Sequence, residues 1–371
     1  MKKKKFDFSK YSSLLSSLIS IVVGLLIAFV IMILFNSKTG LKGFEALITG
    51  GMKMGGIRNV GSLLFYATPI LCTGVAMCLA FQAGVFNIGG PGQFTTGAFA
   101  AVMTSFLIDG KVSAPLTWII PIITAIIAGA LWALIPGLLK AYLNVNVVIS
   151  TTMFNYIEMY FMVFLVQKYC YDMYRGQSNK IPEASMLPKS FLADLTNNSP
   201  ADIGIIIAIV AAIAVWVLLE KTKIGYELKA CGKNAQASRY AGIKEKRNIM
   251  ISILISGALC GLGGGLSHLS QAGVYIKAIE ATAAEGFTGI AVCCLANNSP
   301  IGAILGALFI GYLTVGGSYM QLFGFQKEIV SVITGIIIYF ASFSLFLKQS
   351  LERILNKKKI QKNKVTGEDL V

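Results

Sequence analysis

Charged residues are scarce in this sequence. They make up 13% of its 371 residues, about half the share found in an average soluble domain, whereas hydrophobic residues make up 55%. Several runs, such as 18–35 and 203–219, have no ionisable group and approach the roughly 20 residues that a helix needs to cross a bilayer. A soluble fold does not need several such runs. The composition therefore predicts an all-α polytopic membrane protein.

The sequence also has few of the residues on which catalysis, metal binding or disulfide formation depends. It has one histidine, His268, and seven cysteines with no CxxC pair and no Cys/His cluster. We therefore expect no disulfide framework, no metal site and no catalytic residue, with the cysteines acting as small buried hydrophobes and His268 as a packing residue. No GxxxxGK[ST] phosphate-binding loop occurs either. If such a chain moves a solute across the membrane, it must use a partner's ATPase, couple to an ion gradient or act passively.

Ten apolar segments predict about ten transmembrane helices, at 11–35, 61–83, 92–108, 115–139, 147–167, 203–219, 249–270, 284–296, 301–322 and 329–347. Eight crossings stay open as an alternative, because 284–296 is short. Ten crossings put both termini on one side, with the turns near 84–91, 140–146 and 297–300 and the loop 220–248. These segments hold 21 of the 32 basic residues but 7 of the 17 acidic ones, as the positive-inside rule asks of cytoplasmic segments.

The expected domain organisation follows from this topology. Residues 1–10 form a cytoplasmic basic N-terminus, 11–347 the transmembrane domain and 348–371 a cytoplasmic basic tail. Within the domain, 168–202 is long enough for a small extracytoplasmic cap, and 220–248 is the substantial cytoplasmic loop. Because membrane topology and contact with lipid account for the basic charge, we expect no nucleic-acid partner.

Two glycine-containing polar stretches interrupt the apolar pattern and resemble each other. The first contains "QAGVF" at 82–86 and "GQFTTG" at 92–97; the second contains "QAGVY" at 271–275 and "EGFTG" at 285–289. The charge pattern places the first at the cytoplasmic end of helix 2 and the second at the outer end of helix 7. This predicts an inverted repeat in which transmembrane helices 2–5 are mirrored by helices 7–10. Such paired interruptions favour a transport pathway, and close packing at glycines is the alternative.

Polar and aromatic residues near the interruptions are candidates for the substrate pathway. A carboxylate is costly near the bilayer centre and should face a cavity or a partner, and amides can pair with the polar edges of a ligand while rings stack on it. Hydrogen bonding between helices without a ligand is the alternative for any one residue. The candidates are Phe86, Asn87, Gln93, Phe94, Asn155, Glu158, Glu285 and Phe287.

The loop 220–248 contains the pattern of a short capped helix. Asn234 can cap a helix at 235–241, and Gly242 sits where a left-handed glycine ends one. Arg239 and Tyr240 should project from a surface of small residues and could insert into a groove of another protein. An ordinary basic loop is the alternative, and it explains the lysines but not the capped helix.

On these residues, the chain resembles the permease subunits of ABC importers for branched-chain amino acids, ribose and nucleosides. The resemblance covers about 41–347 and is strongest in "VAMCLAFQAGVFNIGGPGQFTTGAFAA", "VVISTTMFNYI", "TKIGYELKACGKNAQASRYAGI" and "GFTGIAVCCLANNSPIGAILGALFIGYLTVG". The form "FNIGGPGQ" is most similar to the nucleoside branch, with simple-sugar and riboflavin permeases as near relatives. Two features depart from the family pattern: Pro91 stands where relatives often have an acidic residue, and "CCLANN" at 293–298 replaces a glycine-rich, basic form.

The resemblance implies a permease subunit in the cell membrane, with both termini cytoplasmic, that translocates a nucleoside. A simple sugar or riboflavin-like ligand is the alternative, and an ion-coupled secondary transporter is the alternative from another class. It further implies a second, homologous or identical permease, a cytoplasmic ATPase and an extracytoplasmic substrate-binding protein or lipoprotein. The chain itself would bind no cofactor, since the ATPase uses the ATP. The family's coupling helix corresponds to 229–243, with Lys229, Gly232, Ala235, Ala237, Arg239, Tyr240 and Gly242 as the residues implied in coupling.

Overall fold

The computed structural model describes residues 8–50, 52–189, 191, 195–271 and 275–343. Within them lie the strands β1 (Tyr171–Asp172) and β2 (Gln177–Ser178) and the 3-10 helices η1 (Glu183–Ser185) and η2 (Gln321–Phe323). The other elements are the α-helices α1 (Phe8–Phe35), α2 (Gly40–Ile48), α3 (Met52–Gly55), α4 (Arg58–Gln82), α5 (Gly90–Ile108), α6 (Leu116–Leu143), α7 (Val147–Tyr169), α9 (Gly204–Lys221), α10 (Lys223–Lys233), α11 (Ala235–Tyr240), α12 (Glu245–Leu269), α13 (Ala284–Leu295), α14 (Pro300–Met320) and α15 (Lys327–Ser342).

A helix occupies each of the ten apolar segments, so the expected all-α class is confirmed. Six helices in the described residues are long and apolar enough to cross a membrane: α4, α6, α7, α9, α12 and the α14–η2 segment. The Ile19–Phe35 part of α1 and the 12-residue α13 are shorter apolar helices. Ten crossings therefore stay a prediction. The basic residues at 1–7 and the tail from 344 onward lie outside the described residues.

The chain divides into two compact units. The described parts of Met1–Ile48 and Gly317–Val371 form the first, and those of Thr49–Gly316 form the second. In the first unit, α1 packs on α15, and a methyl group on Gly24 would lie 3.1 Å from the backbone oxygen of Ile337. The rings of Phe29 and Phe44 join α1 to α2, with centroids 4.6 Å apart.

Glycines let α12 approach α5 and α6 closely in the second unit. A methyl group on Gly97 would lie 2.4 Å from the Cα atom of Gly261, and one on Gly129 would lie 2.4 Å from the backbone oxygen of Gly257. Small residues at such contacts are typical of helices that pack within membranes. Gly97 therefore agrees with the alternative considered from the sequence, in which the glycines let helices pack closely.

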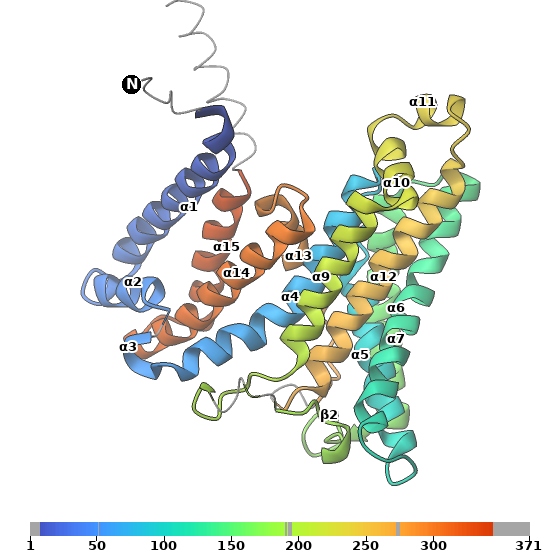
Figure 1. The fold of residues 1–371 in the computed structure, drawn as a ribbon. Helices are drawn as coiled ribbons and strands as arrows, with labels where there is room; N and C mark the ends of the chain where they lie inside the picture. The colour runs from blue at the N-terminus through green and yellow to red at the C-terminus, as the bar shows by residue number, and fades with distance from the viewer. Residues whose placement is uncertain (1–7, 51, 190, 192–194, 272–274, 344–371) are drawn as a thin grey trace, which may run out of the picture. The chain divides into compact units, whose positions relative to one another are not determined.

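The connections expected in the cytoplasm lie together at one end of the second unit. Gln82 Nε2, at the end of α4, donates a hydrogen bond to the backbone oxygen of Asn298 over 2.7 Å. Val85 shares a buried cluster with Ala141 and Val147, on either side of the 140–146 turn. Figure 1 shows α10 and α11 at this same end of α6, α9 and α12. The four connections therefore share one end, as the charge pattern predicted.

The described part of the segment 168–202, expected outside the cell, lies at the opposite end of the second unit, where Figure 1 shows β2. β1 and β2 form an antiparallel hairpin, and Ser178 N donates a 2.8 Å hydrogen bond to the backbone oxygen of Ile276. Leu187 N donates to the backbone oxygen of Leu269 over 2.9 Å. The described residues of 168–202 thus pack against the end of α12 and the segment that follows it, and an extracytoplasmic cap there stays a prediction.

Candidate functional site

A buried pair of amide side chains holds the first interruption, between α4 and α5. Asn87 Nδ2 donates to Gln93 Oε1 over 3.0 Å, and Gln93 Nε2 donates back to Asn87 Oδ1 over 3.3 Å. Asn87 also donates to Ser256 Oγ on α12 and accepts from the backbone N–H of Gly89. Lipid cannot form hydrogen bonds with these polar groups, so they find their partners within the protein.

Helix α7 supplies the partners for the backbone of this interruption. Asn155 Oδ1 accepts from the N–H of Gly92 over 3.0 Å, and its Nδ2 donates to the backbone oxygen of Ile88 over 2.9 Å. Thr151 Oγ1 accepts from the N–H of Ile88 over 3.3 Å. The interrupted segment is therefore a defined turn, fixed from two sides by α7 and α12.

The second interruption meets the first where α5 and α13 begin. Thr73 Oγ1, in α4, donates to the backbone oxygen of Glu285 over 2.9 Å. A methyl group on Gly286 would lie 2.3 Å from the nitrogen of Pro91, so the first turns of α13 and α5 touch. Helix α13 starts against the interior of α4 and ends near Gln82, whose side chain bonds Asn298. Residues 272–274 of the second "QAGVY" stretch lie outside the described residues.

The eight candidate pathway residues fall into two groups. Asn87, Gln93, Phe94, Asn155 and Glu158 are buried. Phe86 and Phe287 are 45% and 43% exposed, and Glu285 is partly exposed in the first turn of α13. The structure thus brings the three amides together but leaves the two exposed rings outside their cluster. The amides bond protein atoms here, which matches the alternative of interhelical hydrogen bonding, and ligand contact stays a prediction.

Glu158 lies at the point where α5, α6 and α7 meet. It shares the buried face of α7 with Asn155, and it is 1% exposed. Its Oε1 and the Nε1 of Trp132 have no hydrogen-bond partner among the described residues, and both side chains flank Gly92. We expected Glu158 to face a cavity or a partner; its Oε1 has no hydrogen-bond partner among the described residues, and a cavity beside it stays a prediction. An ionisable group buried at membrane depth is a functional candidate by default.

Sequence reasoning missed Thr73, Thr151, Ser256 and Trp132 as members of this site. Ser256 lies four residues after Ser252 in α12, and both are fully buried. Polar residues at this spacing in an apolar segment share one helix face, which is the signal that could have identified Ser256. His268 contacts Phe94 edge-on and its Nδ1 lies 3.1 Å from the backbone oxygen of Gly264, so it packs as expected.

The capped helix expected in the loop 220–248 is present as α11. Asn234 Oδ1 accepts from the N–H of Ala237 over 3.0 Å. Gly242 has a φ of +78°, and its N–H bonds the oxygen of Arg239 while the N–H of Ile243 bonds that of Ser238. This pattern is a Schellman motif. The helix ends at Tyr240, one residue earlier than expected.

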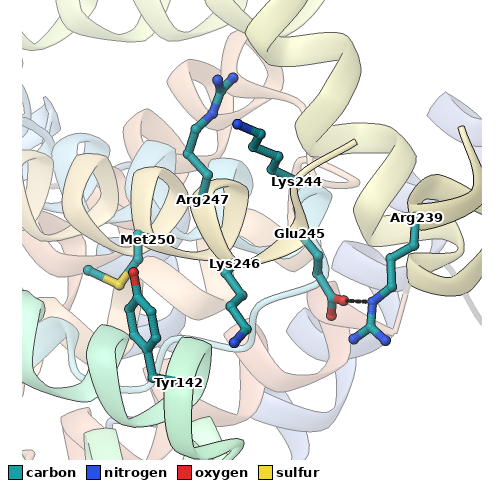
Figure 2. A pocket seen from close by; sticks show the side chains of 7 residues that line it. All are labelled: Tyr142, Arg239, Lys244, Glu245, Lys246, Arg247 and Met250. Atoms are coloured by element: carbon teal, nitrogen blue, oxygen red, sulfur yellow. Dashed lines mark hydrogen bonds and ion pairs between the residues drawn. The ribbon is translucent and has the colours of Figure 1, made fainter. Parts of the chain in front are cut away.

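The outer surface of α11 differs in part from the expectation. Tyr240 projects with 95% of its surface exposed, and Ala237 is exposed beside it. Ser238, one of the small residues of this helix, is buried instead, and its hydroxyl donates to the backbone oxygen of Asn234. Arg239 is held by an ion pair with Glu245, shown as the dashed line in Figure 2. Ala235 is half-buried, so the exposed face is narrower than expected.

The loop touches the first interruption directly. A methyl group on Gly232, in α10, would lie 2.2 Å from the backbone oxygen of Gln82. A methyl group on Gly84 would lie 2.8 Å from the Cα atom of Gly232, and Gly84 has a φ of +74°, which favours glycine. Lys229 forms a 2.9 Å ion pair with Glu220, which fixes α10 to α9. A displacement of α10 would therefore be felt at the turn that leads into α5.

Long apolar helices and a meeting point of two interrupted segments define a multi-pass membrane protein of the permease class. Residues 59–342 match the family described as "Branched-chain amino acid transport system / permease component". The chain belongs to this family, which confirms the resemblance seen in the sequence. No solved structure matches the chain.

Relatives of similar length are permease proteins of ABC transporters. The chain is 36% identical over 349 residues to the guanosine ABC transporter permease protein NupP of Bacillus subtilis (strain 168), covering 94% of this chain and 98% of NupP. It is 32% identical over 367 residues to the nucleoside ABC transporter permease protein NupB of Lactococcus lactis subsp. cremoris (strain MG1363), covering 97% and 99%. The glucose ABC transporter permease protein TsgB13 of Haloferax volcanii is 31% identical over 302 residues, which is 77% of each chain.

Proposed function

We propose that this chain is the permease subunit of an ABC importer and translocates nucleosides across the cell membrane. The observation that carries the proposal is its similarity, over nearly the whole chain, to NupP and NupB, whose names give guanosine and nucleosides as substrates. Membership of the permease family supports the transport class independently of the ligand.

In this proposal the chain crosses the membrane ten times as an inverted repeat of α4–α7 and α12–α15, with both termini in the cytoplasm. Two observations support it. The connections divide between two ends as the positive-inside rule requires. The interruption before α5 and the one before α13 start from opposite ends of the second unit and meet at Pro91 and Gly286. Discontinuous helices in corresponding positions of two repeats are typical of transport sites.

The proposed assembly contains a second permease, homologous or identical, a cytoplasmic ATPase and an extracytoplasmic substrate-binding protein. The ATPase binds α11, where Tyr240 and Ala237 are exposed and Asn234 and Gly242 fix both ends of the helix. The binding protein docks at the opposite end, near the hairpin of β1 and β2. No cofactor binds this chain, and ATP is used by the ATPase.

Coupling in this proposal is mechanical. Closure of the ATPase displaces α11 and with it α10, which is continuous with it through Asn234. The contact between Gly232 and the turn at Gln82 and Gly84 then shifts the segment that leads into α5. Because the first turns of α5 and α13 touch, the shift changes both interruptions together. The result is a switch between two packed states, biased by the ATPase.

The pathway residues have different roles in this scheme. Asn87, Gln93 and Asn155 hold the interruption in the conformation described, and the partly exposed Glu285 and Phe287 of α13 are available to a ligand. Phe86 stacks on Phe81 with ring centroids 4.5 Å apart. It lies in the first interruption, at the end of the second unit that carries the loop 220–248. A base ring stacking on Phe287 is the contact that best suits a nucleoside.

The proposed substrate can be tested by an uptake assay in cells that take up nucleosides through this importer. We expect uptake of labelled guanosine to be inhibited by excess unlabelled nucleosides and to be lost when this chain is deleted. Excess glucose should leave uptake unchanged. Loss of labelled glucose uptake on deletion of this chain, with guanosine uptake retained, would instead support a sugar importer.

The sugar alternative is favoured by one observation, the 31% identity to the glucose permease protein TsgB13. A riboflavin-like ligand has weaker support, because the probable riboflavin import permease protein RfuC of Treponema pallidum is 22% identical over 253 residues. Excess riboflavin in the same uptake assay separates this ligand from nucleosides.

A further inference from the structure

A basic groove lies at the loop end of the second unit, where α6 ends and α12 begins. It encloses about 650 Å³ and is lined by residues of α6, α11 and α12. Four of its side chains are cationic: Arg239, Lys244, Lys246 and Arg247. Among the described residues that line it, Glu245 is the one carboxylate, and it forms an ion pair with Arg239 (Figure 2). The groove therefore carries an excess of positive charge.

Two of these cations have no acidic partner in the part of the chain that the structure describes. Arg247 pairs with Glu227 over 3.0 Å, whereas no ion pair within the described residues involves Lys244 or Lys246. The ammonium group of Lys246 lies 5.3 Å from the centre of the Tyr142 ring, and Tyr142 is itself 63% exposed. Exposed lysine and tyrosine side chains at the ends of membrane helices are typical of the headgroup region of a bilayer.

An exposed apolar stripe leads along α6 to this groove. Its members follow one another at intervals of three or four residues, so they lie on one face of the helix. At 1.5 Å per residue the stripe is about 28 Å long, more than the roughly 15 Å of one leaflet's hydrocarbon. The stripe consists of Ile123, Ile127, Leu131, Ile135, Leu138 and Tyr142, all at least 40% exposed.

We infer that this groove binds the phosphodiester headgroup of an anionic phospholipid, with the acyl chains lying along the α6 stripe. Lys244 and Lys246 neutralise the phosphate, and Tyr142 marks the boundary between headgroup and hydrocarbon. The stripe favours a lipid over a soluble anion, because a free phosphate would have no use for an apolar face next to the cations. The inference rests on the proposed orientation, with this end in the cytoplasm.

The test measures binding of phosphatidylglycerol and of phosphatidylcholine with identical acyl chains to the purified full-length chain, by native mass spectrometry. We expect a preference for phosphatidylglycerol that falls about 30-fold in Lys244→Gln/Lys246→Gln, at about 1 kcal/mol per basic residue near an anionic headgroup. The matched control is Lys221→Gln/Lys223→Gln, which removes the same charge from the same loop outside the groove. The control should keep the preference.

Three results would overturn the inference. The first is an equal loss, or no loss, of preference in both double variants, which would indicate a general surface effect. The second is displacement of the lipid by soluble glycerol phosphate at equal concentration, which would make the groove a site for free phosphate. The third is an unchanged lipid preference with loss of ATPase co-purification in the groove variant, which would assign the groove to the ATPase. Since binding requires neither ATP nor nucleoside, this test is separate from that of transport.

Discussion

Gly286 shows how much of the site depends on the absence of a single side chain. It lies in the first turn of α13 against Gly90 and Pro91, so the two interrupted segments can touch backbone to backbone. Asn87, Gln93 and Asn155 then satisfy the polar groups around the turn from neighbouring helices. At this scale the site depends on a few close contacts and a few amide hydrogen bonds.

We predict that Gly286→Ala destabilises the protein, because its methyl group would lie 2.3 Å from Pro91 N and must push α13 away. Overpacking of this kind costs about 1–3 kcal/mol, which a thermal unfolding assay in detergent would record as a lower midpoint. The control is Gly335→Ala in α15, where no atom lies within 4 Å of the new methyl group. This control should be neutral or slightly stabilising. Equal midpoints for the two variants would show that α13 and α5 do not touch.

Single elements differ in how well the sequence predicts them. The caps of α11 were predictable because Asn234 and Gly242 bond backbone groups only a few residues away. The partners of Asn87 were not, because Ser256 is 169 residues distant and depends on how α12 packs. The burial of Ser238 and the ion pair of Arg239 also escaped prediction, since each depends on the fold of the loop. Hydrogen bonds between residues close in the sequence can be predicted from it, whereas bonds between distant residues require the tertiary structure.

At the scale of the element, we predict that Gly242→Ala uncouples the ATPase from uptake. The residue has a φ of +78° and no atom within 4 Å of an added methyl group, so the substitution adds only backbone strain of roughly 1–2 kcal/mol. That strain acts on the last turn of α11. We expect ATP hydrolysis by the assembled importer to continue while nucleoside uptake falls several-fold.

The matched control for Gly242→Ala is Gly110→Ala. Gly110 has a φ of +67° and also has free space around it, but it lies between α5 and α6, away from the loop 220–248. Its substitution adds similar strain without touching α11. An equal fall in uptake in both variants would contradict the coupling role, because the effect would then follow from strain in general.

The whole molecule combines features that the sequence showed with others that only the fold provides. Apolar runs and the distribution of lysines predicted the helices and the grouping of their connections at two ends. They did not show that α13 begins against the interior of α4, because that depends on contacts such as Thr73 with Glu285, 212 residues apart. The sequence did not show the direct contact of α10 with the first interruption either. These contacts connect the proposed ATPase site to the proposed pathway.

The central claim is that ATP hydrolysis drives nucleoside import through this chain, and reconstitution tests it most directly. Proteoliposomes containing the complete importer, supplied with the substrate-binding protein and labelled guanosine, would be loaded with ATP or with a non-hydrolysable analogue. The account predicts uptake with ATP alone, unaffected by ionophores that collapse ion gradients. Uptake that persists with the analogue and disappears with the ionophores would contradict it, and would indicate an ion-coupled transporter instead.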